Sequence, residues 1–283
     1  MKIGIFTVCM PDFEPVEAME VASRLGYDGM EWRVTDDQGD RAKPSFWSGN
    51  RTSMTPADVI AKADELKAAA ARLNVEMPSL AAYICCADPE AVENAFQAAN
   101  AIGAGNIRVN TCGFDPAADY KKQIQDNRAY YAEVEKLAKR YNVRALIETH
   151  MGLITPTIQS AVQVLEGLDP EHVGIMWDPG NQIYEGRERF DMAIRAAGPY
   201  LGEVHVKNAI IRETEVANGH QLWTTTWCPL RKGMVDWYAV VENLRAVNYD
   251  GWFMLEDFSN DEPDTAARLK DDIAFLREDC GIV

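Results

Sequence analysis

Short runs of apolar residues alternate along the chain with longer stretches in which apolar positions recur at helical spacing. The short runs predict eight β-strands, at residues 3–8, 29–34, 75–84, 106–110, 143–148, 173–177, 202–206 and 252–255. The stretches between them predict crossover helices, of which the longest lie at residues 56–73, 89–102, 120–141 and 235–247. Strict alternation of strand and helix is typical of a parallel sheet. We therefore predict an α/β protein with a closed (β/α)8 (TIM) barrel, and a doubly wound sheet is the alternative.

The length of the chain favours one domain over residues 1–283. Barrels of this class occupy roughly 250 residues, and no linker rich in Pro, Gly or Ser divides the sequence. Two connections that follow predicted strands, the long loops at 35–54 and 208–232, exceed what a barrel needs. Because loops that follow barrel strands build the active-site face, we expect both to be lids over a site, contacts in an oligomer, or both.

Composition excludes several classes of protein. The chain is 47% hydrophobic and carries a net charge of −16, whereas a nucleic-acid-binding surface needs clustered Lys and Arg, so we expect no nucleic-acid partner. The apolar run near residue 1 stops at Pro11-Asp12 and is too short for a signal sequence or a membrane span. We predict a cytoplasmic protein with no membrane partner.

Cysteines and common motifs narrow the chemistry further. No C-x-x-C pair occurs, so we interpret the cysteines as reduced packing residues. They are Cys9, Cys85, Cys86, Cys112, Cys228 and Cys280. Gly103-Ala104-Gly105 has Arg108 where a dinucleotide-binding loop needs its third glycine, and it precedes a strand instead of following one. Nucleotide-dependent and serine-hydrolase chemistries therefore lack their usual motifs.

The last four predicted strands end on side chains that ligate metals. These side chains are Glu148, Asp178, His205 and Glu256. Strand ends meet at one mouth of a barrel, where three ionised carboxylates need a compensating positive charge. Three oxygen ligands and one imidazole suit one divalent metal ion, for which we favour Mn²⁺ with Mg²⁺, Co²⁺ or Zn²⁺ as alternatives. Polar strand ends occur in any barrel, but four ligand types on four consecutive strands indicate a metal site.

The residues around these ligands resemble a known family. Segments Trp177-Asp178-Pro179-Gly180-Asn181, His205-Val206-Lys207 and Tyr249-Asp250-Gly251-Trp252 are similar to the sugar-phosphate isomerase/epimerase family of xylose-isomerase-like TIM barrels, which includes ketose epimerases and inosose dehydratases. The resemblance covers nearly the whole chain. It implies that one ion is held by all four ligands, with Glu148 and Glu256 on opposite sides of the substrate.

That arrangement implies a mechanism. A metal bound to a carbonyl and the neighbouring hydroxyl stabilises the enediolate that forms when a carboxylate removes the proton between them. The resemblance assigns Glu148 and Glu256 as catalytic acid and base, and Asp178 and His205 as structural ligands. We therefore expect a divalent-metal-dependent isomerase or epimerase of a sugar, keto-sugar or polyol derivative.

Other functions stay open. Ketose 3-epimerases of the family carry a histidine three residues after the strand-end aspartate, where this chain has Asn181. A lyase that eliminates water or another group from a keto-sugar through the same enolate is therefore the main alternative. A repair endonuclease with a histidine-rich three-zinc site fits poorly with a chain of 4 histidines. A sugar-binding barrel without activity, or a metal-bearing subunit of a complex, is a further alternative.

Residues near the strand ends are candidates for contacting the substrate, although each has a structural interpretation as well. They are His150, Asn181, Lys207, Arg212, Trp177 and Glu31. A phosphorylated substrate would need a glycine-rich loop or clustered basic residues, and Arg231-Lys232 is the one basic pair nearby. We expect an unphosphorylated small-molecule carbohydrate. A homo-oligomer or a hetero-complex fits the aromatic-rich connections.

Overall fold

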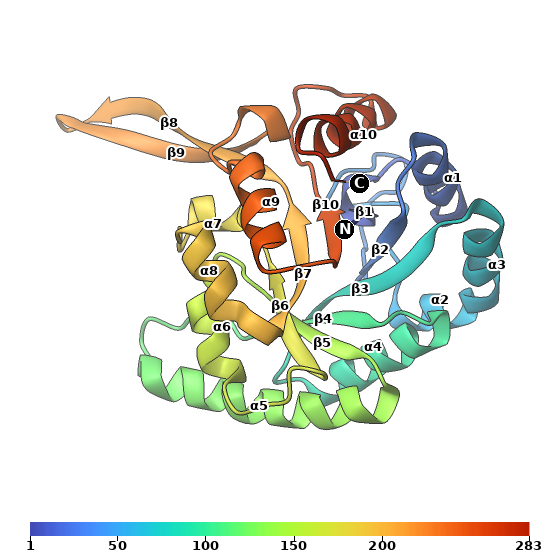
Figure 1. Cartoon of the computed structure of the whole chain (residues 1–283), viewed down its shortest axis with the longest axis horizontal. Helices are drawn as coiled ribbons and strands as arrows, with labels where there is room; N and C mark the ends of the chain where they lie inside the picture. Colours follow the sequence, from blue (N-terminus) through green and yellow to red (C-terminus); the bar gives the residue numbers. More distant parts are fainter. Residues whose placement is uncertain (283) are drawn as a thin grey trace.

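The computed structural model describes residues 1–282 and contains a closed barrel of parallel strands with helices around its outside (Figure 1). The strand order around the barrel is β1, β10, β7, β6, β5, β4, β3, β2. Their bounds are β1 Lys2–Phe6, β2 Gly29–Val34, β3 Glu76–Cys85, β4 Asn106–Asn110, β5 Arg144–Glu148, β6 Val173–Trp177, β7 Leu201–Val206 and β10 Trp252–Leu255. Because β1 pairs with both β2 and β10, the sheet closes. The predicted fold class is confirmed.

The barrel strands begin and end within two residues of the predicted positions. The first strand shows the largest difference at one end, because it stops at Phe6 and residues Thr7–Cys9 form a 3-10 turn. The hydroxyl of Thr7 accepts the backbone N–H of Arg33 at 2.9 Å. This side-chain hydrogen bond therefore takes the place of the backbone hydrogen bonds that pair β1 with β2 up to this point.

Helices follow each of the barrel strands along the chain. Their bounds are α1 Pro15–Leu25, α2 Pro56–Ala61, α3 Ala63–Leu73, α4 Pro89–Ile102, α5 Tyr120–Tyr141, α6 Ile158–Leu165, α7 Asn181–Tyr184, α8 Phe190–Ala197, α9 Trp237–Ala246 and α10 Thr265–Ala274. Thr55 and Asp88 cap α2 and α4 through their side chains, each just before a proline in the first turn. The helix predicted over 56–73 is divided at Lys62, the one residue between α2 and α3.

The connection at 208–232, expected to be a loop, is a β-hairpin that projects from the barrel (Figure 1). Strand β8 (Asn208–Ala217) pairs antiparallel with β9 (His220–Cys228). Asn218 and Gly219 form the turn with φ of 53° and 76°, the backbone that favours a two-residue hairpin turn. An Asn-Gly pair between two β-prone segments was therefore a sequence signal for this hairpin.

The connection at 35–54 is irregular but well anchored. The Asp37 carboxylate accepts the backbone N–H groups of Gly39, Gly49 and Asn50 at 2.9 to 3.0 Å. Arg33 pairs with the same carboxylate at 3.0 Å, and both side chains are buried. These contacts hold the segment against the end of the barrel after β2.

Large apolar side chains fill the layer between barrel and helices. Trp32, Phe253 and Trp237 are at most 1% exposed, and Phe253 of β10 contacts Trp237 of α9 edge to face. Alternate residues of the same strands point into the barrel, and there Glu31, next to Trp32, is fully buried. No helix within residues 1–282 is long and apolar enough to cross a bilayer.

Candidate metal centre

The four predicted ligands lie together at one end of the barrel. Glu148 ends β5, Asp178 follows β6, His205 lies in β7 and Glu256 follows β10. All are at most 2% exposed. Their ligand atoms all lie within 4.8 Å of one another. We refer to these four residues as the metal cluster.

The imidazole of His205 is at the centre of the metal cluster. Its Nδ1 lies 2.8 Å from Oε1 of Glu256, 3.4 Å from Oε1 of Glu148 and 4.0 Å from Oδ2 of Asp178. Within residues 1–282 this buried nitrogen makes no hydrogen bond of acceptable geometry. A ring nitrogen that faces three carboxylates in this way fits a divalent cation held between them. The donor set therefore suits the predicted ion.

The other nitrogen of His205 faces two more carboxylates inside the barrel. Nε2 lies 2.9 Å from Oε2 of Glu31 and 3.9 Å from Oε1 of Glu203. Ser79 donates to Glu203 at 3.1 Å. Burial raises the pKa of Glu203 well above its ordinary value, and the neighbouring Glu31 raises it further. The Glu31 carboxylate therefore faces the side of His205 that is away from the other members of the metal cluster, where its negative charge can orient the imidazole.

Arg108 of β4 is a functional candidate that the sequence interpretation missed. Its Nη1 lies 2.7 Å from Oε2 of Glu148, and both side chains are buried. Burial alone would raise the pKa of Glu148, but Arg108 and His205 outweigh it and hold that pKa well below its ordinary value. A charged residue in the middle of an apolar strand was the available signal, because a buried charge needs a partner.

Lys207 is the second cation beside the metal cluster. Its Nζ lies 2.7 Å from Oδ2 of Asp178 and donates to Oε2 of Glu256. Burial raises the pKa of Asp178 to about 6 although Lys207 opposes the shift. His205 and Lys207 together outweigh burial at Glu256 and lower its pKa. Glu148 and Glu256 therefore each direct one carboxylate oxygen at His205. The second oxygen of Glu148 pairs with Arg108, and the second oxygen of Glu256 pairs with Lys207.

Aromatic side chains of Trp227, in the connection at 208–232, and of Phe258, after β10, cover Lys207. Its Nζ lies 5.2 Å from the rings of Trp227 and Phe258. Phe258 contacts Phe46 and Trp47 at ring distances of 5.3 and 4.6 Å, and Trp227 at 5.7 Å. We refer to Phe46, Trp47, Trp227 and Phe258 as the aromatic cover. Phe258 thus joins the segments at 35–54 and 208–232 beside the metal cluster.

The structure places one of the remaining candidates for contacting the substrate, Asn181, at the metal cluster, and two others, Trp177 and Arg212, away from it. Asn181 lies at the metal cluster, since its Nδ2 donates to Oε1 of Glu148 at 3.2 Å. His150, two residues after Glu148, is half-buried, and its Nδ1 lies 2.7 Å from the backbone oxygen of Met151.

The structure does not bring Trp177 or Arg212 to the metal cluster. Trp177 is fully buried and contacts Phe190 of α8 edge to face, because strand alternation turns it away from the side on which Asp178 lies. Its indole N–H donates to Gln182. Arg212 is exposed and opposite Thr224 in the projecting hairpin.

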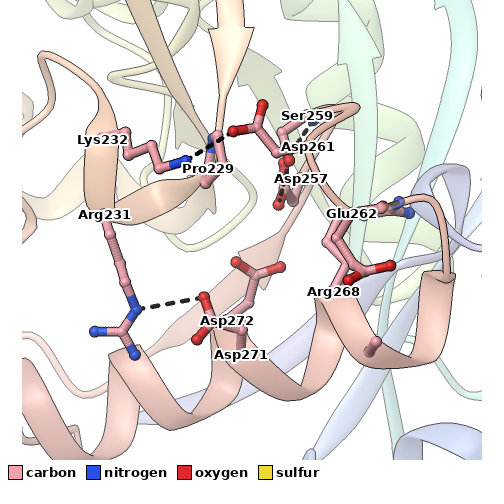
Figure 2. A pocket seen from close by; sticks show the side chains of 11 residues that line it. Pro229, Arg231, Lys232, Asp257, Ser259, Asp261, Glu262, Arg268, Asp271 and Asp272 are labelled. Carbon is pink, nitrogen blue, oxygen red and sulfur yellow. Dashed lines mark hydrogen bonds and ion pairs between the residues drawn. The ribbon is translucent and has the colours of Figure 1, made fainter.

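A separate cleft of about 260 Å³ holds the basic pair noted in the sequence (Figure 2). Lys232 contacts Asp261 at 2.8 Å, and Arg231 contacts Asp271 at 3.3 Å. Both cations thus face acidic side chains. This cleft has no residue in common with the metal cluster.

Comparisons with known proteins identify the family of this chain. A sequence model of the family described as xylose isomerase-like TIM barrel matches residues 19–279. The chain is 23% identical over 155 residues to an inosose dehydratase of Geobacillus thermodenitrificans (strain NG80-2), a match that covers 52% of this chain and 51% of that protein. The chain therefore spans about half the length of this relative.

Two solved structures are similar in fold over nearly the whole chain. The 3-keto-D-glucoside 4-epimerase YcjR from E. coli superposes with a TM-score of 0.72 at 19% identity, over 98% of this chain and 99% of that one. A structure of the IOLI protein with a zinc atom gives a TM-score of 0.76 at 13% identity, over 99% of this chain and 98% of the other. Since the family match spans most of the barrel that carries the metal cluster, the chain belongs to the xylose isomerase-like TIM barrel family.

Proposed function

We propose that the protein is a divalent-metal-dependent isomerase or epimerase of an unphosphorylated sugar, keto-sugar or polyol derivative. One observation carries the proposal: Glu148 and Glu256 both point an oxygen at His205 Nδ1, while Arg108 and Lys207 hold their second oxygens. Ionised carboxylates are the form that can accept a proton from carbon. The proteins that this chain resembles in sequence include a dehydratase and an epimerase.

The residues of the chain divide the chemistry between them. A divalent cation held by the metal cluster would stabilise negative charge on a substrate oxygen next to the carbon that loses its proton. Glu148 or Glu256 accepts that proton, and the other glutamate delivers one from the opposite side. Arg108 keeps Glu148 ionised by charge pairing, and Asn181 holds its Oε1 by a hydrogen bond.

Solvent exchange tests this proposal. Protein loaded with Mn²⁺ is incubated in D₂O with free ketoses, 3-keto-glucosides and keto-inositols, and products are followed by NMR and mass spectrometry. We expect one deuterium on the carbon next to the carbonyl, without loss of mass from the sugar. Glu148→Gln and Glu256→Gln should each abolish exchange, whereas Glu215→Gln, on the exposed hairpin, should leave it intact. Full exchange in either of the first two variants would contradict their roles.

A lyase is the second candidate, and Lys207 supports it. Elimination needs stabilisation of the departing hydroxyl group. Burial would lower the pKa of Lys207, but Asp178 and Glu256 outweigh it and raise that pKa, so the ammonium stays protonated and can donate a hydrogen bond to the leaving oxygen. Asn181 supports it too, since an amide lacks the charge and proton-shuttling capacity of the histidine in related 3-epimerases. Loss of one water from the substrate in the same assay would select the lyase. No exchange with any substrate at full metal loading would favour a sugar-binding barrel.

The remaining parts of the proposal concern substrate and location. An unphosphorylated substrate is supported by Arg231 and Lys232, which already contact acidic partners (Figure 2). The cytoplasmic location, the choice of Mn²⁺ and an oligomeric assembly stay predictions.

A further inference from the structure

Three thiols that are separated in the sequence meet at the carboxyl ends of β3 and β4. Cys85 ends β3, Cys86 follows it, and Cys112 lies two residues after β4. Their sulfurs all lie within 4.8 Å of one another, and Sγ of Cys85 is 2.7 Å from Sγ of Cys112. The parallel register sets this contact, because Cys85 is opposite Asn110. All three are free cysteines.

The three thiols have different surroundings. Cys86 is 5% exposed, and its thiol donates to Oδ1 of Asn127 at 3.4 Å. The same oxygen accepts the backbone N–H of Cys112 at 2.9 Å, which fixes the chain at that point. Cys85 and Cys112 are half-buried, so a small oxidant can reach them. The neighbouring thiols of Cys86 and Cys112 lower the pKa of Cys85 to about 5.

A metal explains this geometry less well than a disulfide does. Thiolates on one tetrahedral zinc lie about 3.8 Å apart, since each Zn–S bond is about 2.3 Å, and the contact between Cys85 and Cys112 is shorter. Within residues 1–282, no His, Asp, Glu or further Cys joins the group as a fourth ligand. Cys228 and Cys280 differ from this pair, because burial raises the pKa of both thiols to about 11.

We propose that Cys85 and Cys112 are a site of reversible oxidation, at which a hydroperoxide converts the two thiols to a disulfide across the ends of β3 and β4. The thiolate of Cys85 attacks one peroxide oxygen, the O–O bond breaks, and the released hydroxide takes a proton to leave as water. The sulfur of Cys112 then attacks the sulfenic acid on Cys85, the S–S bond forms, and a second water leaves. Two thiols are oxidised and one peroxide is reduced to two waters. A dithiol reductant reverses the change.

The disulfide would connect two parts of the barrel mouth. Cys112 accepts the backbone N–H of Ile154 at 3.0 Å, and Gly113 bridges Leu153. The segment from His150 to Ile154 follows Glu148, a member of the metal cluster. Oxidation at Cys112 therefore restrains the backbone next to that cluster. This proposal rests on the thiol geometry and is independent of the proposed function.

The test uses the full chain, reduced and then treated with one equivalent of hydrogen peroxide. Free thiols are blocked with iodoacetamide, and the protein is analysed by intact-mass and peptide mass spectrometry. We expect two fewer alkylated thiols than in the reduced protein, a linked peptide pair containing Cys85 and Cys112, and full reversal by dithiothreitol. Cys86→Ser and Cys280→Ser should still form this pair. Cys112→Ser should instead accumulate sulfenic acid on Cys85, trapped by dimedone.

Several outcomes would overturn the proposal. These are loss of the linked peptide pair in Cys86→Ser, a crosslink between two chains, or oxidation of Cys85 no faster than that of Cys280. Zinc that stays bound to the thiols through dialysis and is lost in Cys112→Ser would assign them to a metal site instead. Circular dichroism of each variant shows whether the fold is retained, so a misfolded serine variant would not be mistaken for a negative result.

Discussion

Glu31 and Glu256 lie on opposite edges of the His205 imidazole, with Oε2 of Glu31 2.9 Å from Nε2 and Oε1 of Glu256 2.8 Å from Nδ1. Glu31 and Glu256 outweigh burial and raise the pKa of His205 well above its ordinary value. When Nδ1 faces a cation, the proton belongs on Nε2, and the negative charge of Glu31 2.9 Å away favours it there, although the two atoms make no hydrogen bond of acceptable geometry in this structure. The position of Glu31 therefore selects the tautomer that a metal ligand needs.

Glu31→Gln should weaken metal binding without removing the site. A glutamine keeps a neutral side chain of the same size beside Nε2, but the negative charge that strengthens the ligand is lost, so we expect about 10 to 100-fold lower affinity for Mn²⁺ and Zn²⁺. Competition with a fluorescent chelator measures this. His205→Ala should bind less than one ion per chain, and Glu213→Gln on the exposed hairpin should match the unchanged protein. If Glu31→Gln bound Mn²⁺ and Zn²⁺ as tightly as the unchanged protein, Glu31 would not orient His205 for metal binding.

Arg108→Leu should destabilise the metal-free protein by about 3–5 kcal/mol, since it leaves the buried carboxylate of Glu148 without its partner. The double variant with Glu148→Gln should recover part of that loss, because a neutral amide costs less to bury. Urea unfolding in the presence of a chelator measures both. Equal stability losses in the single and double variants would show that Arg108 acts through packing alone, for example against Tyr83, whose ring lies 4.5 Å away.

Trp227→Ala should open the aromatic cover. Trp227 contacts Tyr184 and Phe258 at ring distances of 4.5 and 5.7 Å, and aromatic pairs contribute about 0.5–1.5 kcal/mol each. We expect a loss of about 1–2 kcal/mol in the free energy of unfolding and faster hydrogen exchange in residues 35–54. Trp223→Ala is the matched control, since Trp223 is 60% exposed on the same strand. Indistinguishable results for the two variants would argue against a cover.

A buried acidic pair in the lining of the cleft of Figure 2 predicts a pH-dependent stability. Asp272 is 2% exposed, and burial together with Asp257 raises its pKa well above the ordinary value. A carboxyl group whose pKa is raised in the folded protein favours the folded state only while it is protonated. Its contribution to the stability of the protein is therefore complete below the unfolded pKa near 3.9 and is lost as pH rises through the folded pKa.

Asp272→Asn should remove this loss, because the amide does not ionise. We expect the variant to exceed the unchanged protein in stability by about 1–3 kcal/mol at pH 8, with a much smaller difference at pH 4, measured by urea unfolding. Asp271→Asn is the control, since the side chain of Asp271, next to Asp272 in the sequence, is 61% exposed and contacts Arg231. If the stability difference between Asp272→Asn and the unchanged protein were the same at both pH values, ionisation of Asp272 would not be the cause.

The sequence by itself determined where the barrel strands lie and which side chains end them. A continuous apolar run such as 173–177 can only be a buried strand in this alternating pattern, and the polar residue after it, Asp178, must then lie at the barrel mouth. Asn218-Gly219 is a local turn signal of the same kind, and the expectation of a loop at 208–232 did not use it. These signals are local, because strand periodicity and turn chemistry depend on a few neighbouring residues.

Only the tertiary structure decided which charges and thiols meet. Arg108 and Glu148 lie 40 residues apart in the sequence, and the pairing of β4 with β5 brings them together. The parallel register likewise places Cys85 beside Cys112, and strand alternation turns Trp177 toward α8 and away from the site. Such contacts depend on the closure and stagger of the barrel, which are properties of all its strands together and are not encoded in the spacing of any one segment.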